Sequence, residues 1–252
     1  MTAEAWLSSR VEDAGLNASA PPEQRWLDGW LLRLSPGKAK RARCINAVAE
    51  GRLPLAARLQ WTLAAYREAG LPPILRVTPF IQPPALAEVL LGLGWRRLDD
   101  TRVMTLAELG SIEAPALTPR ALTPRAYART VGTLRGSPPA QQAAHARRLQ
   151  HSPVPYRGYA IERDGAVLAC GQMAIEADLV GLYDVFTAPA ARGQGLATGL
   201  CRWLLAAAVA QGARHAYLQV EADNQAARAI YHRLGFADAY GYHYLTPDPD
   251  AS

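Results

Sequence analysis

Residues 192–197 read Arg-Gly-Gln-Gly-Leu-Ala, and residues 218–236 read LQVEADNQAARAIYHRLGF. The first stretch lies between a predicted strand and a predicted helix, where Gly193 and Gly195 allow a tight turn and a close approach to a ligand. Free backbone N–H groups at the start of a helix bind phosphate. A glycine-rich turn of this kind is typical of several phosphate-binding folds, so its ligand must be identified from the second stretch.

The sequence around these two stretches alternates between helix and strand patterns. Thr123 followed by Pro124, and Ser137 followed by Pro138, are typical of helix starts. Asp164-Gly165 between two apolar runs predicts a hairpin. Helices are expected over 124–133, 138–150, 195–211 and 225–234, and strands over 159–163, 166–175, 179–187, 216–221 and 240–245. The pattern predicts an α/β protein with a mixed sheet.

The two stretches together resemble the acetyl-CoA signatures of the GNAT superfamily of N-acetyltransferases. Arg192, Gly195 and Ala197 match the family's Q/R-x-x-G-x-G/A loop, and Asn224 and Tyr231 match its second motif. The resemblance implies a GNAT fold in the C-terminal half and acetyl-CoA as co-substrate. It assigns cofactor contacts to the strand Val185, Phe186 and Thr187 through the main chain, to the loop Arg192, Gly193, Gln194, Gly195, Leu196, Ala197 and Thr198, and to Asn224.

The resemblance gives Tyr231 the role of general acid, which protonates the departing thiolate. On periodicity alone Tyr231 belongs to an apolar helix stripe with Ala227, Ile230 and Leu234, a core position. Asn224 also suits a helix N-cap.

The general base is not identified by the resemblance. Relatives that acetylate ribosomal-protein N-termini carry a glutamate where this chain has Gln219, and an amide cannot accept that proton. Glu221 lies on the same strand face, and Asp184 lies on the neighbouring strand. Either carboxylate is a candidate base, and each is also credible as a structural acid.

The loop also has features of another nucleotide-binding turn. Gly193-x-Gly195 also begins a dinucleotide-binding turn. That fingerprint does not fit here, because residues 189–192 separate the turn from the strand and Thr198 stands where glycine or alanine is needed.

The predicted function is direct transfer of acetyl from acetyl-CoA to a primary amine of a small molecule or peptide, in a ternary complex. A non-catalytic acyl-CoA-binding sensor is the alternative.

The first half of the chain weakly repeats the helix and strand pattern of the second half. Leu93-Gly94-Trp95 follows a predicted helix as Leu234-Gly235-Phe236 does, but Leu90 stands in the place of Tyr231 and Pro83 in that of Asn224. No glycine loop precedes the helix predicted over 55–69. The proline-rich stretch 110–125 predicts a boundary between a degenerate GNAT-like domain, 1–114, and an acetyl-CoA-binding catalytic domain, 115–252.

Composition excludes several classes of protein. The 252 residues carry a formal charge of +5 without a polyanion-binding half, so no nucleic-acid partner is expected. Three scattered cysteines and the lack of a signal or spanning segment predict free thiols, a cytoplasmic location and no membrane partner. No histidine spacing predicts a metal. The basic cluster Lys38, Lys40, Arg41 and Arg43 is interpreted as a solvated hairpin, with contact to an anionic substrate or nucleic acid as the alternative.

Overall fold

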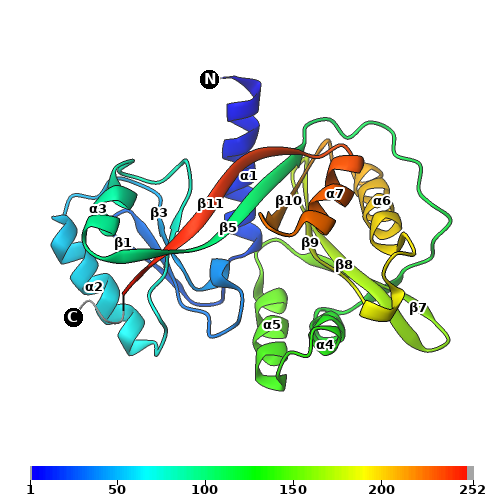
Figure 1. Ribbon diagram of the computed structural model, residues 1–252, viewed down its shortest axis with the longest axis horizontal. Helices are drawn as coiled ribbons and strands as arrows, with labels where there is room; N and C mark the ends of the chain where they lie inside the picture. The colour runs from blue at the N-terminus through cyan, green and yellow to red at the C-terminus, as the bar shows by residue number, and fades with distance from the viewer. Residues whose placement is uncertain (1, 249–252) are drawn as a thin grey trace.

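The computed structural model describes residues 2–248, and their strands form one mixed sheet (Figure 1). The predicted α/β class is confirmed. The eleven strands lie in the order β1-β2-β3-β4-β11-β5-β10-β9-β8-β7-β6. The outer ends of the two predicted domains, residue 1 and residues 249–252, lie outside the described residues. The strands are β1 Gln24–Leu27, β2 Trp30–Arg33, β3 Ile45–Ala47, β4 Leu75–Val77, β5 Trp95–Leu106, β6 Arg120–Leu122, β7 Tyr156–Arg163, β8 Ala166–Glu176, β9 Leu179–Thr187, β10 His215–Glu221 and β11 Ala237–Pro247.

Local sequence signals explain most of the helix ends. Thr123 caps the first helix of the second half by accepting the N–H of Ala126 at 3.2 Å, as predicted. Ser137 makes no such cap, because the next helix begins beyond Pro138. Gly235 has φ +92° where the last helix ends, which only glycine adopts readily. The helices are α1 Ala3–Ala18, α2 Leu55–Glu68, α3 Leu86–Gly92, α4 Pro124–Leu134, α5 Pro139–His151, α6 Leu196–Val209 and α7 Gln225–Arg233, with short 3-10 turns η1 Lys40–Ala42 and η2 Pro189–Ala191.

The two halves of the chain repeat one order of elements. In the first half β2 and β3 are antiparallel, α2 crosses to β4 in parallel with β3, and α3 leads to β5. In the second half β8, β9, α6, β10, α7 and β11 follow the same order, again with one parallel pair, β9 and β10. The closing strands are exchanged, because β11 pairs with β4 and β5 pairs with β10. β5 and β11 also pair with each other, so the halves share a continuous sheet.

Two apolar clusters cover opposite faces of the second half of the sheet. Tyr183 of β9 and Tyr217 of β10 pack with α1 and α4 on one face. Their neighbours Leu182 and Leu218 point the other way and pack with α6. The alternation follows from the period of two along a strand. Helices of both halves, α1 and α4, therefore meet on the first of these faces.

The first half has a core of its own, tied to the second half through α1. Trp30, Tyr66 and Leu75 are fully buried in this core. Buried Arg76 of β4 donates to both carboxylate oxygens of Glu12 on α1, which lies close to β11. Each charge of a buried pair offsets part of the other's cost of leaving water, so the loss of one partner is strongly destabilising. This ion pair links α1 to β4, and the Tyr240 hydroxyl of β11 also donates to Glu12, at 2.8 Å.

Residues 107–119 connect the two halves around the outside of the second half (Figure 1). A methyl group added at Gly199 of α6 would meet Leu117 at 2.8 Å, so this connection packs against α6. The boundary predicted in this segment stays a prediction, because β5 and β11 join the halves directly.

The structure also bears on membrane and metal binding. Within residues 2–248 no helix has both the length and the apolar character needed to cross a bilayer. The same residues contain no group of three or more histidine, cysteine, aspartate or glutamate side chains arranged to hold a metal ion. The cytoplasmic location stays a prediction.

Candidate functional site

The parallel strands β9 and β10 separate before they end. Their pairing runs from Leu179 and His215 to Leu182 and Leu218, but β9 continues to Thr187 and β10 to Glu221. Beyond Leu182 the facing backbone edges no longer pair with each other. Backbone N–H and C=O groups need partners, so a gap between strands suits an extended ligand that carries amides.

A β-bulge at Asp184 shapes the gap. Cys170 pairs with Phe186 and Gln172 with Tyr183, so two residues of β9 lie opposite Gly171 alone. Asp184 takes φ +49°, the left-handed region that aspartate tolerates better than most residues. The Tyr127 hydroxyl donates to the Asp184 carbonyl oxygen at 2.9 Å. The bulge turns the Asp184 side chain toward the face that α4 and α5 cover.

The predicted cofactor loop follows β9 and begins α6. Gly193 and Gly195 have φ +77° and +73°, and a methyl group added at either would meet nothing within 4 Å. Gly195 is the N-cap of α6 and no side chain caps the helix, so the N–H groups of its first turn stay available. Arg192 lies over the ring of Phe186, at 6.0 Å from the centroid. The loop therefore has the geometry of an anion site.

Asn224 and Tyr231 lie on α7, near the same edge of the sheet. The Asn224 Oδ1 accepts the N–H of Ala227 at 3.1 Å, which confirms the N-cap interpretation. Half-buried Tyr231 packs edge-on against Phe236, with ring centroids 6.1 Å apart. Burial, together with nearby Cys201, raises the pKa of Tyr231 above its usual value, so its phenol stays protonated at neutral pH.

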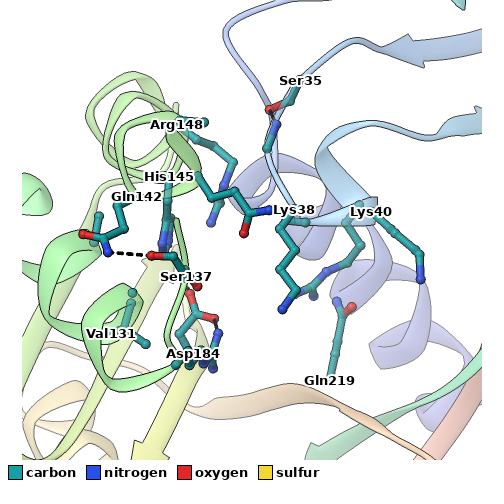
Figure 2. Close-up of a pocket in the computed structure, with 18 of the residues that line it drawn as sticks. Ser35, Lys38, Lys40, Val131, Ser137, Gln142, His145, Arg148, Asp184 and Gln219 are labelled. Carbon is teal, nitrogen blue, oxygen red and sulfur yellow. Dashed lines mark hydrogen bonds and ion pairs between the residues drawn. The ribbon is translucent and has the colours of Figure 1, made fainter. Parts of the chain in front are cut away.

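A cavity of about 370 Å³ opens on the α4 and α5 face of the gap. Its walls are α4, α5, the connection 34–44 between β2 and β3, and parts of β5, β9, β10 and β11. Figure 2 shows His145 and Arg148 of α5 on one side and Lys38 and Lys40 of the connection on the other. The cavity is thus built by both halves of the chain.

Both candidate bases line this cavity, in different surroundings. The Asp184 carboxylate accepts from Arg135 at 3.0 Å and from Gln172 at 2.9 Å, and His145 Nε2 lies 3.4 Å away. Burial opposes ionisation of Asp184, but Arg135, His145 and Arg148 outweigh it and lower its pKa to about 2. Glu221 is exposed at the end of β10. Asp184 is therefore held as an anion.

Gln219, which replaces the glutamate of some relatives, serves a structural contact. Its Oε1 accepts from the hydroxyl of buried Tyr242 at 2.8 Å. Its amide nitrogen lies 3.0 Å from the position that a methyl group at Gly15 of α1 would take. Gln219 thus fills the space between β10, β11 and α1 at the edge of the cavity.

Several cavity residues were not found from the sequence. The interpretation of the basic cluster as a solvated hairpin is wrong for Arg41, which is half-buried, lines the cavity and lies 5.8 Å from the Tyr183 ring centroid. Arg148 and His145 carry no motif, and only the fold brings them to Lys38. The dense run of cations at 38–43 was the one available signal.

The chain is similar to known acetyltransferases. The acetyltransferase (GNAT) family model matches residues 128–236, which include the loop and Tyr231. The uncharacterized N-acetyltransferase YobR of Bacillus subtilis (strain 168) is 25% identical over 231 residues, 88% of this chain and 91% of that protein. A GCN5-related N-acetyltransferase from Kribbella flavida has a TM-score of 0.66 at 20% identity, over 95% of each chain. A tandem GNAT protein from the clavulanic acid biosynthesis pathway has a TM-score of 0.59 at 18% identity, over 78% of this chain and 70% of its own.

Proposed function

The chain belongs to the acetyltransferase (GNAT) family through residues 128–236, and from that premise we propose that it moves an acetyl group from acetyl-CoA to a primary amine of a small molecule or peptide. Family membership makes it an acyltransferase. The observation that carries the proposal is the gap between β9 and β10, which has an open anion-binding loop at its end and a cavity on one face.

The residues around the gap fit acetyl-CoA. The uncapped first turn of α6 and Arg192 offer N–H groups and positive charge to a pyrophosphate. Thr187 contributes a buried hydroxyl without a hydrogen-bond partner, beside the strand edge where pantetheine amides would pair. When bound, acetyl-CoA supplies a thioester carbonyl open to attack by an amine. Val185 and Phe186 hold this donor through main-chain groups, and Asn224 adds a polar contact at its side.

Direct transfer is favoured because no cysteine is suited to carry the acetyl group. Cys44, Cys170 and Cys201 are fully buried and unpaired in a disulfide. Burial raises the pKa of Cys170 to about 11 and that of Cys201 to about 12, so neither is a thiolate at neutral pH. In the proposed reaction Tyr231 donates its phenol proton to the departing sulfur.

Glu221 is the better of the two candidate bases. The attacking amine must lose a proton, and an exposed carboxylate at the end of β10 reaches solvent and the cavity together. Asp184 already accepts hydrogen bonds from Arg135 and Gln172, and its pKa of about 2 makes it a weak base. We assign Asp184 to positioning the α4 and α5 side of the cavity.

The first half is proposed to be a degenerate copy that no longer binds cofactor. Its repeated order of elements supports this, and so does the start of α2. There the carboxylate of Asp28 accepts the N–H groups of Arg52 and Leu53, at 2.9 and 2.8 Å. An internal anion thus occupies amides near the helix start, and Pro54 replaces the N-cap glycine.

The test is acetylation itself. The protein is incubated with acetyl-CoA and a panel of amino acids, polyamines, aminoglycosides and short peptides, and thiol release is followed with mass detection of the acetylated amine. The proposal predicts turnover of at least one amine. Tight CoA binding without turnover of any amine would overturn it and would favour the sensor alternative.

A further inference from the structure

The cavity beside the gap holds more positive charge than the protein neutralises. Its walls carry five cations and three carboxylates: Lys38, Lys40, Arg41, Arg135 and Arg148 against Asp99, Asp184 and Glu221. Lys40 pairs with Asp99, and Arg135 pairs with Asp184. Between residues 2 and 248, none of the other three cations forms an ion pair with a carboxylate.

Arg148 is the most unusual of these cations. Its side chain is only 9% exposed, and it lies against the ring of Tyr156, 5.8 Å from the centroid. Asp184 acts on this guanidinium only from beyond ion-pair distance, so its burial stays costly, and the cost falls when an anion binds. Arg41 shows a similar feature, because its Nη1 atom is buried without a hydrogen-bond partner among residues 2–248.

The third unpaired cation comes from the other side of the cavity. Lys38 is exposed and belongs to the connection 34–44 of the first half, opposite α5 (Figure 2). Arg148 and Lys38 thus belong to different halves of the chain and line one space. A planar guanidinium and a flexible ammonium facing one cavity are a common arrangement for binding carboxylate or phosphate.

We propose that the acceptor is a small amine that also carries an anionic group, and that Arg148 and Lys38 hold this group. The inference rests on the proposed function, because it names the acceptor class of the same site. The cavity volume of about 370 Å³ suits a molecule of amino-acid size. Glu221, the carboxylate of the cavity without an ion-pair partner, then faces the ammonium end, and the anionic end lies toward α5.

The first experiment compares matched acceptors at constant acetyl-CoA. Alanine is paired with alaninamide, and O-phosphoethanolamine is paired with ethanolamine. The anionic member of at least one pair should have a kcat/KM tenfold or more above its neutral partner, and the better pair tells carboxylate from phosphate. Equal or faster acetylation of every neutral partner would overturn the inference and leave the proposed function standing. Failure of all amines is instead the failure of the proposed function.

The second experiment tests the residues. Arg148→Gln should raise KM for the preferred anionic acceptor about 10- to 100-fold, the worth of a charge-assisted hydrogen bond, and leave KM for acetyl-CoA unchanged. Arg147→Gln is the matched control, because Arg147 is exposed on the same helix and pairs with Glu23 outside this cavity. Lys38→Gln, at an exposed position, repeats the test in a variant whose folding is not at risk. Unchanged acceptor KM in folded Arg148→Gln and in Lys38→Gln would overturn the assignment.

Discussion

Replacing Gly195 by aspartate tests the cofactor loop at its most sensitive point. Gly195 is the N-cap of α6 with φ +73°, and the space above it is open. A non-glycine residue in this region costs about 1–2 kcal/mol, but aspartate tolerates it better than most residues and returns about 1 kcal/mol as an N-cap. The melting temperature should therefore change by less than about 4 °C.

The effect on cofactor binding should be much larger. A carboxylate about 5 Å from a pyrophosphate charge repels it by roughly 3 kcal/mol at an effective dielectric constant near 20. That energy corresponds to a CoA affinity about 100-fold weaker. Gly195→Asn is the matched control, since asparagine has the same shape and backbone tolerance without the charge. It should weaken binding by roughly tenfold through its hydrogen bond to the helix N-terminus.

Isothermal titration of the three proteins with CoA measures both effects, and circular dichroism melts verify folding. If folded Gly195→Asp binds CoA within about threefold of the unmodified protein, the loop is not the phosphate site. Equal losses for aspartate and asparagine would show that charge plays no part, and that the loop does not face a phosphate.

Three further predictions concern catalysis and stability. Tyr231→Phe should lower kcat by about 10²- to 10⁴-fold, which is the usual contribution of a general acid. The melting temperature should stay unchanged, because the ring still packs on Phe236. A kcat within threefold of normal would show that Tyr231 is not the general acid. Burial lowers the pKa of His145 from 6.5 to about 4, against the attraction of Asp184. The unfolded state therefore takes up the proton first, so this contribution to stability is complete above pH 6.5 and falls by at most about 3 kcal/mol as the pH drops to 4. Urea unfolding at pH 7 and pH 5 should show a smaller acid loss in His145→Gln, and an identical loss would contradict the burial argument. Glu12→Ala should cost about 3–5 kcal/mol in urea unfolding by leaving buried Arg76 unpaired, whereas a loss below 1 kcal/mol would show that the ion pair does not tie α1 to β4.

Sequence patterns were sufficient to predict most elements of the second half, but not the short strand β6, which lies in the stretch interpreted as a boundary. The Thr123 cap, the Asp164-Gly165 turn and the left-handed Gly235 are local signals, and each depends on residues within a few positions. The same locality explains why the loop from Arg192 could be located from sequence. The length of β5 depends on long-range pairing, because its first residues pair with β11 from the far end of the chain.

The cavity could not be predicted from the sequence for a related reason. Arg148 and Lys38 are more than a hundred positions apart, and only the exchange of closing strands brings α5 near the connection between β2 and β3. The bulge that turns Asp184 toward the cavity depends on how β8 pairs with β9, and no local pattern encodes that register. Long-range pairing, rather than local propensity, builds this cavity.

Direct transfer in a ternary complex is the central claim, and initial velocities measured against both substrates test it most directly. With the best amine of the panel, the account predicts double-reciprocal plots that intersect, because donor and acceptor occupy the gap and the cavity together. It also predicts that the mass of the intact protein stays unchanged after incubation with acetyl-CoA alone. Parallel plots, together with a protein that gains one acetyl group, would contradict it.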